Sequence, residues 1–259
     1  TLYYQCSSHA GMGGQINTNS TLGSSNFDGS IQSTAKVNAS AGFSIVGYTG
    51  NGSAGATVGH GLGVAPNVII IKNRTDSSNA SWAVYHSSAF VNASNPKIVY
   101  LNSTVGGQSD TNVLGTSVTI NSTKFSLGDY NGTNGSGDNM ISYCFSEVAG
   151  YSKFGSYTGN GSSDGTFIFT GFKVAFLITK KVQAENWHML DTTRDPLNPN
   201  TLGIDPNLAS AEADDSNLSI DFLSNGFKLR TSHSTNNQDG VQYIYLAFAE
   251  SPFKYARAR

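Results

Sequence analysis

The sequence predicts an all-β protein made of two tandem, duplicated antiparallel β-sandwich domains of the jelly-roll or lectin-like kind. Three observations lead to this fold class. Short stretches alternate between apolar and polar residues, Asn-Gly pairs separate many of them, and one series of segments occurs twice in the same order. Alternation is typical of half-buried strands, and Asn-Gly suits hairpin turns because both residues tolerate positive φ.

The duplication is the strongest signal. The hexapeptide YTGNGS occurs at Tyr48–Ser53 and again at Tyr157–Ser162. Further matched segments follow in one order: NVIIIK with AFLITK, SWAVYH with NWHMLD, KFSL with GFKL, and ISYCFSE with IYLAFAE. Shared composition alone does not produce so many ordered matches. We therefore expect two repeats, at 43–150 and 151–259.

Each repeat predicts strands in matching places. Val68–Ile71 and Phe176–Ile178 are apolar runs that are too short for buried helices. Alternation marks the next strand, at Trp82, Val84 and His86. Near the end of each repeat, large apolar side chains share one face of a strand: Ile141, Tyr143 and Phe145, then Ile244, Leu246 and Phe248. Val182–Asp214 has the weakest strand pattern, and its prolines predict an extended loop.

Residues 1–42 match neither repeat. Within 16–42, Ile31, Ala35 and Val37 alternate, which predicts a Ser/Thr/Asn-rich linker containing one strand. The alternative is a strand that pairs with the first repeat or with a neighbouring subunit. The chain also begins in the strand-like run TLYYQC without an initiator methionine. We therefore expect it to be the C-terminal part of a longer protein.

Composition excludes several classes of function. Charged residues make up 12% of the chain and the net charge is −2, whereas an ordinary domain is about 25% charged. Such a chain has no field that attracts nucleic acid or an anionic membrane. No apolar run approaches the roughly 20 residues of a membrane span. We expect no nucleic-acid partner, no membrane insertion and, from two cysteines alone, no disulfide framework.

Catalytic motifs do not emerge from the sequence, and we expect neither enzymatic activity nor a cofactor. GHGLGV at 59–64 is glycine-rich but precedes a strand rather than a helix, so it does not predict nucleotide binding. Two pairs of carboxylates stand close enough in sequence for a glycosidase-like cleft, although solvated loop residues are the commoner explanation. These pairs are Asp191 with Asp195 and Asp214 with Asp215.

Matched positions in the two repeats favour structural roles. Cys144 stands where the second repeat has Ala247, which predicts a packing position. Trp82 and Trp187 match each other, which predicts two core anchors. Two further carboxylates match, and we expect each to bind a backbone N–H or a nearby lysine: Glu147 and Glu250.

The first 15 residues resemble the end of a cupredoxin domain. Cys6, His9 and Met12 have the Cys-x2-His-x2-Met spacing of a short cupredoxin ligand loop, after a strand-like run. Thiolate, imidazole and a weak axial thioether are the ligands of a blue-copper site. A cupredoxin takes a further histidine from far upstream, so this ligand set is incomplete. We therefore expect 1–15 to end an upstream cupredoxin-like domain and to hold no functional copper site.

The two repeats resemble a repeated domain of virion-surface and tail-fibre proteins of tailed phages, especially marine cyanophages and pelagiphages. The phrases that carry this resemblance are YTGNGS, HGLGVAPNVIIIK, SWAVYH, YCFSEVAGYSKFGSYTGNGS, RDPLNPN, DFLSNGFKLRT and AFAESPFKYA. In such proteins a cupredoxin-like stretch can precede the repeats. The resemblance implies no catalytic residues, and no ligand-binding residues follow from it.

The resemblance implies a structural or adhesive protein of the virion surface, such as a fibre, a tail component or a head decoration. Its partners would be other virion proteins and host surface glycans. The alternatives are a glycan depolymerase, with its site on the Pro-rich loop at 191–206, and a cellular extracellular adhesin or filament subunit.

Sparse charge also predicts self-association, because the edge strands of sheets have few charged side chains to protect them. By analogy with fibres and surface decorations, we expect a homotrimer. The strand-like segment 27–38 is the candidate for crossing between subunits, since it belongs to neither repeat.

Overall fold

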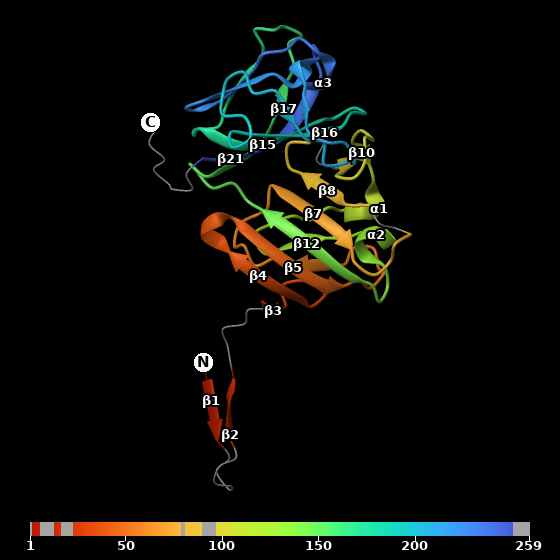
Figure 1. Ribbon diagram of the computed structural model, residues 1–259. Coiled ribbons are helices and arrows are strands. Elements are labelled where there is room, and N and C mark those ends of the chain that lie inside the picture. Colours follow the sequence, from red (N-terminus) through yellow and green to blue (C-terminus); the bar gives the residue numbers. More distant parts are fainter. Residues whose placement is uncertain (1, 6–12, 17–22, 79–80, 90–96, 251–259) are drawn as a thin grey trace.

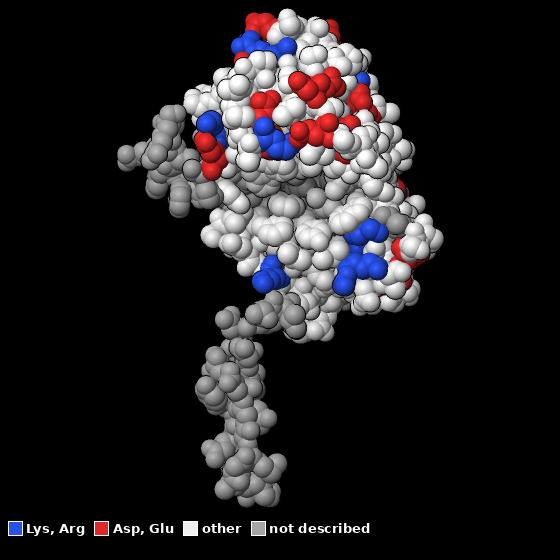
Figure 2. Space-filling model, in the orientation of Figure 1, with Lys and Arg blue, Asp and Glu red and all other residues white. Residues whose placement is uncertain are grey.

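The computed structural model describes residues 2–5, 13–16, 23–78, 81–89 and 97–250 (Figure 1). The structure is 42% strand and 8% helix, with several antiparallel sheets, which confirms the all-β prediction. No helix among the described residues is long and apolar enough to cross a membrane. The visible surface in Figure 2 is mostly uncharged, with acidic and basic side chains intermixed on the second half.

The elements between residues 2 and 145 are the separate two-stranded sheet β1-β2 and those of the first half. They are β1 (Leu2–Gln5), β2 (Gly13–Ile16), β3 (Ser24–Asn26), β4 (Ser33–Asn38), η1 (Ala39–Ala41), β5 (Phe43–Thr49), β6 (Thr57–Gly59), β7 (Val68–Asn73), β8 (Ala83–His86), β9 (Lys97–Tyr100), β10 (Gln108–Ser109), α1 (Thr111–Leu114), β11 (Lys124–Ser126), α2 (Asn131–Asn134) and β12 (Asn139–Phe145).

The elements of the second half lie between residues 152 and 249. They are β13 (Ser152–Thr158), β14 (Phe167–Phe169), β15 (Val174–Lys181), β16 (Trp187–Asp191), β17 (Leu202–Gly203), β18 (Ala213–Asp214), η2 (Ser216–Leu218), β19 (Ile220–Leu223), β20 (Gly226–Leu229), α3 (Ser234–Asn237) and β21 (Gln242–Ala249).

Both halves have the same order of strand pairing. The first contains an eight-stranded sheet, β10-β9-β8-β7-β12-β5-β4-β3, and the pair β11-β6. The second contains β13-β21-β15-β16, together with β14-β20-β19 and β17-β18. The run β5-β12-β7-β8 thus corresponds to β13-β21-β15-β16, and β6-β11 to β14-β20. In Figure 1 the first half is the lower, orange-to-green body and the second is the upper, teal-to-blue body.

The repeated hexapeptide is held by a buried asparagine. Asn134, at the end of α2, is fully buried. Its Oδ1 accepts the N–H of Asn51 at 2.9 Å, and its Nδ2 donates to the carbonyls of Ser53 at 3.1 Å and Gly128 at 2.7 Å. One side chain thereby fixes the turn of the hexapeptide against the segment that precedes α2.

The second hexapeptide has the same arrangement. Asn237, at the end of α3, is also fully buried. Its Oδ1 accepts the N–H of Asn160 at 2.9 Å, and its Nδ2 donates to the carbonyls of Ser162 and Thr231, both at 2.8 Å. The identity of the two hexapeptides therefore reflects one shared turn and one shared hydrogen-bonding partner.

Residues 24–38 add to the first half instead of acting as a linker. β4 pairs with β5 of the same chain along its whole length, and β3 pairs with β4. Ile31 forms a bridge with Val58 and is buried, as is Ala35, whereas Val37 is 39% exposed. The alternation is short because only two apolar side chains enter the core. Segment 27–38, the candidate for crossing between subunits, is paired within its own chain.

Each half has its own apolar core. The first is built on Val46, Val58, Ile69, Ile71, Leu114, Phe125, Leu127, Met140 and Cys144, among others. The second is built on Phe172, Leu177, Leu190, Ile220, Phe227, Leu229, Tyr243 and Ala247, among others. Cys144 is completely buried, which confirms its predicted packing role.

A third apolar core joins the two halves. We call it the interface core, and its buried members are Val68, Val84, Ala89, Val99, Phe154, Trp187, Ile244 and Leu246. Hydrogen bonds accompany it: Trp187 Nε1 donates to the carbonyl of Tyr100 at 2.9 Å, and the His86 ring contacts the carbonyl of Tyr245 at 3.2 Å. Buried apolar contact on this scale makes the two halves one body.

The matched tryptophans have different surroundings. Trp187 is 1% exposed and lies in the interface core, so the prediction of a core anchor is confirmed there. Trp82 directly precedes β8, is only half-buried and stacks on Tyr143. The prediction was wrong for Trp82. The two halves pack through non-equivalent parts of the same kind of sheet face, so only one of the two indoles is covered.

A buried histidine beside the interface core, His86, is expected to make the stability of the protein sensitive to acid. The N–H of Ser88 donates to His86 Nδ1 at 3.1 Å, so Nε2 carries the proton that is shared with the carbonyl of Tyr245. Burial lowers the pKa of His86 to about 4, although the bond to Tyr245 acts in the opposite direction. The folded protein therefore binds the second ring proton, which must add at Nδ1, more weakly than the unfolded chain does.

We expect His86 to reduce the free energy of unfolding by about 3 kcal/mol as the pH falls from about 6.5 to about 4. Its contribution is constant above that window, where the ring is neutral in both states. Urea titrations across this range should show a shallower pH dependence for His86→Gln than for the parent. Burial also lowers the pKa of His60, which both proteins retain. Equal pH slopes for the two proteins would contradict the assignment.

Candidate functional site

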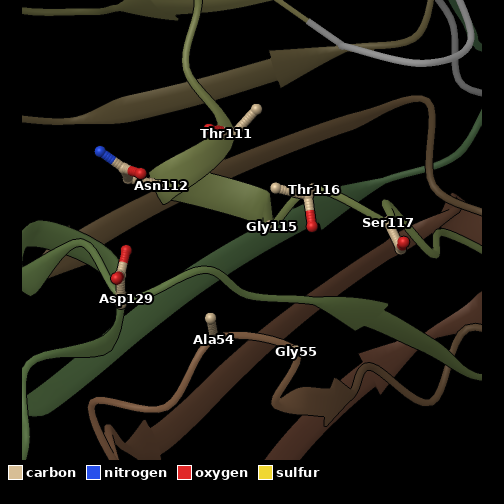
Figure 3. Close-up of a pocket in the computed structure, with 8 residues that line it drawn as sticks. All are labelled: Ala54, Gly55, Thr111, Asn112, Gly115, Thr116, Ser117 and Asp129. Atoms are coloured by element: carbon tan, nitrogen blue, oxygen red, sulfur yellow. The ribbon is translucent and has the colours of Figure 1, made fainter.

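A pocket of about 330 Å³, lined by both polar and apolar groups, opens on the first half beside the turn of the hexapeptide (Figure 3). Its lining comes from three segments that are far apart in sequence: the end of the hexapeptide turn, α1 with the residues after it, and the segment before α2. The lining residues are Ala54, Gly55, Thr111, Asn112, Gly115, Thr116, Ser117 and Asp129.

Helix α1 places one wall of the pocket. The carboxylate of Asp110 accepts the N–H of Asn112 at 3.0 Å, which caps the helix at its first turn. Val113 and Leu114 are buried in the core of the first half. With those two side chains turned inward, Thr111 and Asn112 line the pocket instead.

Close backbone packing places the opposite wall. Gly128 N–H donates to the carbonyl of Val113 at 3.0 Å, and a Cβ at Gly128 would collide with the carbonyl of Asn112. Glycine is therefore required for the chain to pass so near α1. The next residue is Asp129, whose carboxylate is directed toward α1 in Figure 3.

The polar side chains of the pocket are available to a ligand. Those of Asn112, Thr116, Ser117 and Asp129 make no hydrogen bond to any described residue. All four are exposed, and Figure 3 shows the Thr116 hydroxyl directed toward the Ala54–Gly55 turn. Amide, hydroxyl and carboxylate groups both donate and accept hydrogen bonds. The pocket can therefore form hydrogen bonds with a small ligand rich in hydroxyl groups.

One family covers nearly all of the described structure. The family model described as a domain of unknown function, DUF7483, matches residues 17–252. The chain belongs to this family. The matched range includes every element from β3 to β21, and it leaves out β1 and β2. No curated protein and no solved structure matches the chain.

The second half of the DUF7483 domain has a different group at the equivalent place. η2 corresponds to α1, because Asp215 caps it through the N–H of Asn217 at 2.9 Å. The N–H of Gly55 donates to the carbonyl of Leu127 as the N–H of Gly165 does to that of Leu229. The N–H of Gly128 donates to the carbonyl of Val113, in α1, as the N–H of Arg230 does to that of Ser219, directly after η2.

The second half has an ion-pair cluster at the place that corresponds to the pocket. Asp164 stands where the first half has Ala54, and it pairs with Lys228 at 2.6 Å and Arg230 at 3.4 Å. Hydrogen bonding and charge from Lys228 lower the pKa of Asp164. Charged side chains thus occupy in the second half a position where the pocket of the first half has only a methyl group and a glycine. The two halves have diverged at this point.

The carboxylates suggested for a glycosidase cleft bind their own loop. Burial opposes ionisation of Asp191, but hydrogen bonds from Arg194 and Thr193 outweigh it and lower its pKa. Asp191 Oδ2 lies 2.6 Å from Arg194 Nε, and Asp195 Oδ2 accepts the N–H of Thr201 at 2.9 Å. Asp214, in β18, is exposed, and Asp215 caps η2.

The matched glutamates behave as the sequence predicts. Glu147 accepts the N–H of Phe154 at 2.9 Å and pairs with Lys153 at 3.0 Å. Both contacts are with residues near the start of β13. Glu250 pairs with Lys173 at 3.1 Å. Both therefore bind a nearby lysine, and Glu147 also binds a backbone N–H.

The predicted copper ligands lie outside the described residues: Cys6, His9 and Met12. Among the residues that the structure does describe, no three of the His, Cys, Asp and Glu side chains are grouped to hold a metal ion. Burial raises the pKa of Cys144 to about 12, which leaves this thiol protonated and unreactive at neutral pH.

Sequence reasoning alone missed the pocket. Its residues are common polar types, and their approach depends on tertiary contacts of α1. One signal was present: Asp110-Thr-Asn112 and Asp215-Ser-Asn217 repeat the same helix cap, and Ala54 and Asp164 differ beside it. Comparing the repeats for differences, and not only for matches, points to this place.

Proposed function

We propose that this DUF7483 chain is a non-enzymatic structural and adhesive protein on the virion surface of a tailed phage. It would serve as a fibre, tail component or head decoration and bind host surface glycans through the pocket of its first half. The resemblance of the repeats to virion-surface domains supports the location. The lining of the pocket supports the binding role.

We further propose that each half is a β-sandwich of the jelly-roll or lectin-like kind. In the first half, Val46 and Cys144, from the large sheet, share one core with Val58 and Phe125, from the β6–β11 pair. Two sheets that bury their apolar faces against each other form a sandwich. The same relation holds in the second half between β21 and β20.

The observation that carries the binding proposal is the set of unpaired polar groups around one small cavity. A pyranose ring presents several hydroxyl groups, each able to donate and accept, and these match the amide, hydroxyl and carboxylate groups of the lining. Asp129 is the carboxylate among the lining residues, whereas glycoside hydrolysis typically uses a pair. Binding without cleavage fits this arrangement better than a depolymerase does.

We expect Asn112→Ala and Asp129→Asn each to weaken binding to host polysaccharide about tenfold, the loss expected for one good hydrogen bond. The matched control is Asn217→Ala, at the equivalent helix of the second half, which should bind like the parent. Glycan arrays followed by calorimetry on the best sugar measure the effect.

Two results would reject the proposal. One is unchanged affinity in both pocket variants, and the other is the release of shortened polysaccharide by the parent, which would identify a depolymerase. Imaging of labelled particles tests the location on the virion separately from glycan binding.

A further inference from the structure

A seven-residue segment of the second half reads the same in both directions. Residues 165–171 are Gly-Thr-Phe-Ile-Phe-Thr-Gly, and β14 lies at their centre. We call this the palindromic segment. An antiparallel pair of strands relates residues that run in opposite directions, so a palindrome matches itself when two copies pair about its middle residue.

One edge of β14 is unpaired. Among the described strands, β14 pairs with β20 on one side only. The carbonyl of Thr166 accepts a bond from Leu229, and the N–H of Thr170 donates to Asn225. The direction of backbone bonding alternates along a strand. Phe167 and Phe169 therefore point their N–H and C=O groups away from β20, where no described residue bonds them.

In the first half, residues 30–33 cover the equivalent edge. Thr57 of β6 corresponds to Phe167 by its pairing with β11. Its carbonyl accepts the N–H of Ile31 at 3.0 Å, and its N–H donates to the hydroxyl of Ser30 at 2.9 Å. The carbonyl of Gly59 accepts the hydroxyl of Ser33 at 2.8 Å. In the first half this edge therefore binds an added segment of the same chain, through one parallel bridge from Ile31 to Val58 and the bonds of Ser30 and Ser33.

Residues 24–33 of the chain cannot cover the second half in the same way. Gly59 lies directly under Asn26, and a Cβ at Gly59 would collide with the side chain of Asn26. Phe169 occupies the equivalent position in β14. Both phenylalanines are instead open to solvent, with Phe167 44% exposed and Phe169 64% exposed. An apolar partner of different shape is needed here.

We propose that the palindromic segment binds the same segment of a second copy of the chain, as an antiparallel pair centred on Ile168. Phe167 then lies opposite Phe169 of the partner subunit, and the reverse pair follows by symmetry. Each of these pairs exchanges backbone hydrogen bonds, and the phenyl rings meet on one face as cross-strand neighbours. The contact is isologous, as a twofold axis requires.

The flanking residues agree with this register. Thr166 lies opposite Thr170 of the partner subunit, and Gly165 opposite its counterpart at the other end, so no charged side chain opposes another within the segment. The three-stranded sheet β14-β20-β19 continues across the axis. Because the contact is small, we expect association in the micromolar range.

The test is sedimentation of the full chain over a micromolar concentration series. We expect a dimer for the parent, and for Phe169→Lys a dissociation constant at least about tenfold higher, because a lysine would face the partner's phenyl ring. The matched control is Phe27→Lys, at a phenylalanine of the first half that is 72% exposed. It should dimerise like the parent, and circular dichroism checks that each variant folds.

Cross-linking tests the register. Directly opposite residues have Cα atoms about 5.5 Å apart, within the range of a disulfide. A mixture of Phe167→Cys and Phe169→Cys proteins should therefore cross-link on oxidation, whereas each variant alone should not.

Four results would overturn the proposal: a monomeric parent, the homotrimer that the analogy with fibres predicts instead, a dimer that Phe169→Lys leaves intact, or equal cross-linking in the single variants. None of these results bears on glycan binding, so the two proposals fail independently.

Discussion

Replacing Trp187 by alanine is expected to lower the free energy of unfolding by about 4 kcal/mol, within the range for buried tryptophans. The indole is 1% exposed and fills the interface core against residues of the first half. Its loss leaves a cavity, and it also removes the stronger of two donors to the carbonyl of Tyr100, which keeps only the N–H of Ser103 at 3.2 Å. Urea unfolding followed by fluorescence and circular dichroism measures the change.

Trp82→Ala is the matched control, since Trp82 precedes β8 as Trp187 begins β16. Because Trp82 is half-buried and stacks on one tyrosine, we expect a loss of about 1 kcal/mol. Losses of similar size in the two variants would show that the interface core does not hold the halves together.

Replacing Asn134 or Asn237 by alanine is expected to lower the free energy of unfolding by about 2–4 kcal/mol in each case. Either change leaves one buried carbonyl, that of Gly128 or Thr231, without its side-chain donor, at about 1–3 kcal/mol. It also removes two part-buried bonds to the hexapeptide turn, where water can replace part of the loss. Thermal and urea unfolding of both variants measures the effect. Similar losses are expected in the two halves because the hydrogen-bond patterns match.

The control for this pair is Asn51→Ala. Asn51 is exposed, and its side chain accepts one bond, from the N–H of Ser53 at 2.9 Å. We expect a loss below about 1 kcal/mol, because water can take the place of an exposed acceptor. A result as large as that of Asn134→Ala would place the stabilising contact in the turn itself and not in the buried amide.

Much of the fold was predictable, because it depends on local patterns and on repetition. The alternation of Ile141, Tyr143 and Phe145 predicts β12, and the match with Ile244 predicts β21. The order of matched segments predicts that both halves pair their strands alike. This alternation can be read from the sequence because a strand with one apolar face has apolar residues at every second position.

Other features depend on contacts that leave little trace in the sequence. β3 and β4 are polar at most positions, and backbone hydrogen bonds hold β4 to β5 and β3 to β4 with few buried side chains. The different surroundings of Trp82 and Trp187 arise only when the halves pack. The pocket joins 54–55, 111–117 and 129, and no local periodicity relates those segments.

The interface core also bears on how such a chain arises. Its members come from corresponding sheets of the two halves: β7, β8 and β9 with Ala89 in the first, and β13, β16 and β21 in the second. A single repeat on its own would leave this apolar face in water, and only a second molecule could cover it. Joining two repeats in one chain replaces such an encounter between molecules by an internal contact with a high effective concentration. Under the two proposals above, the first half binds the ligand and the second half forms the junction between subunits.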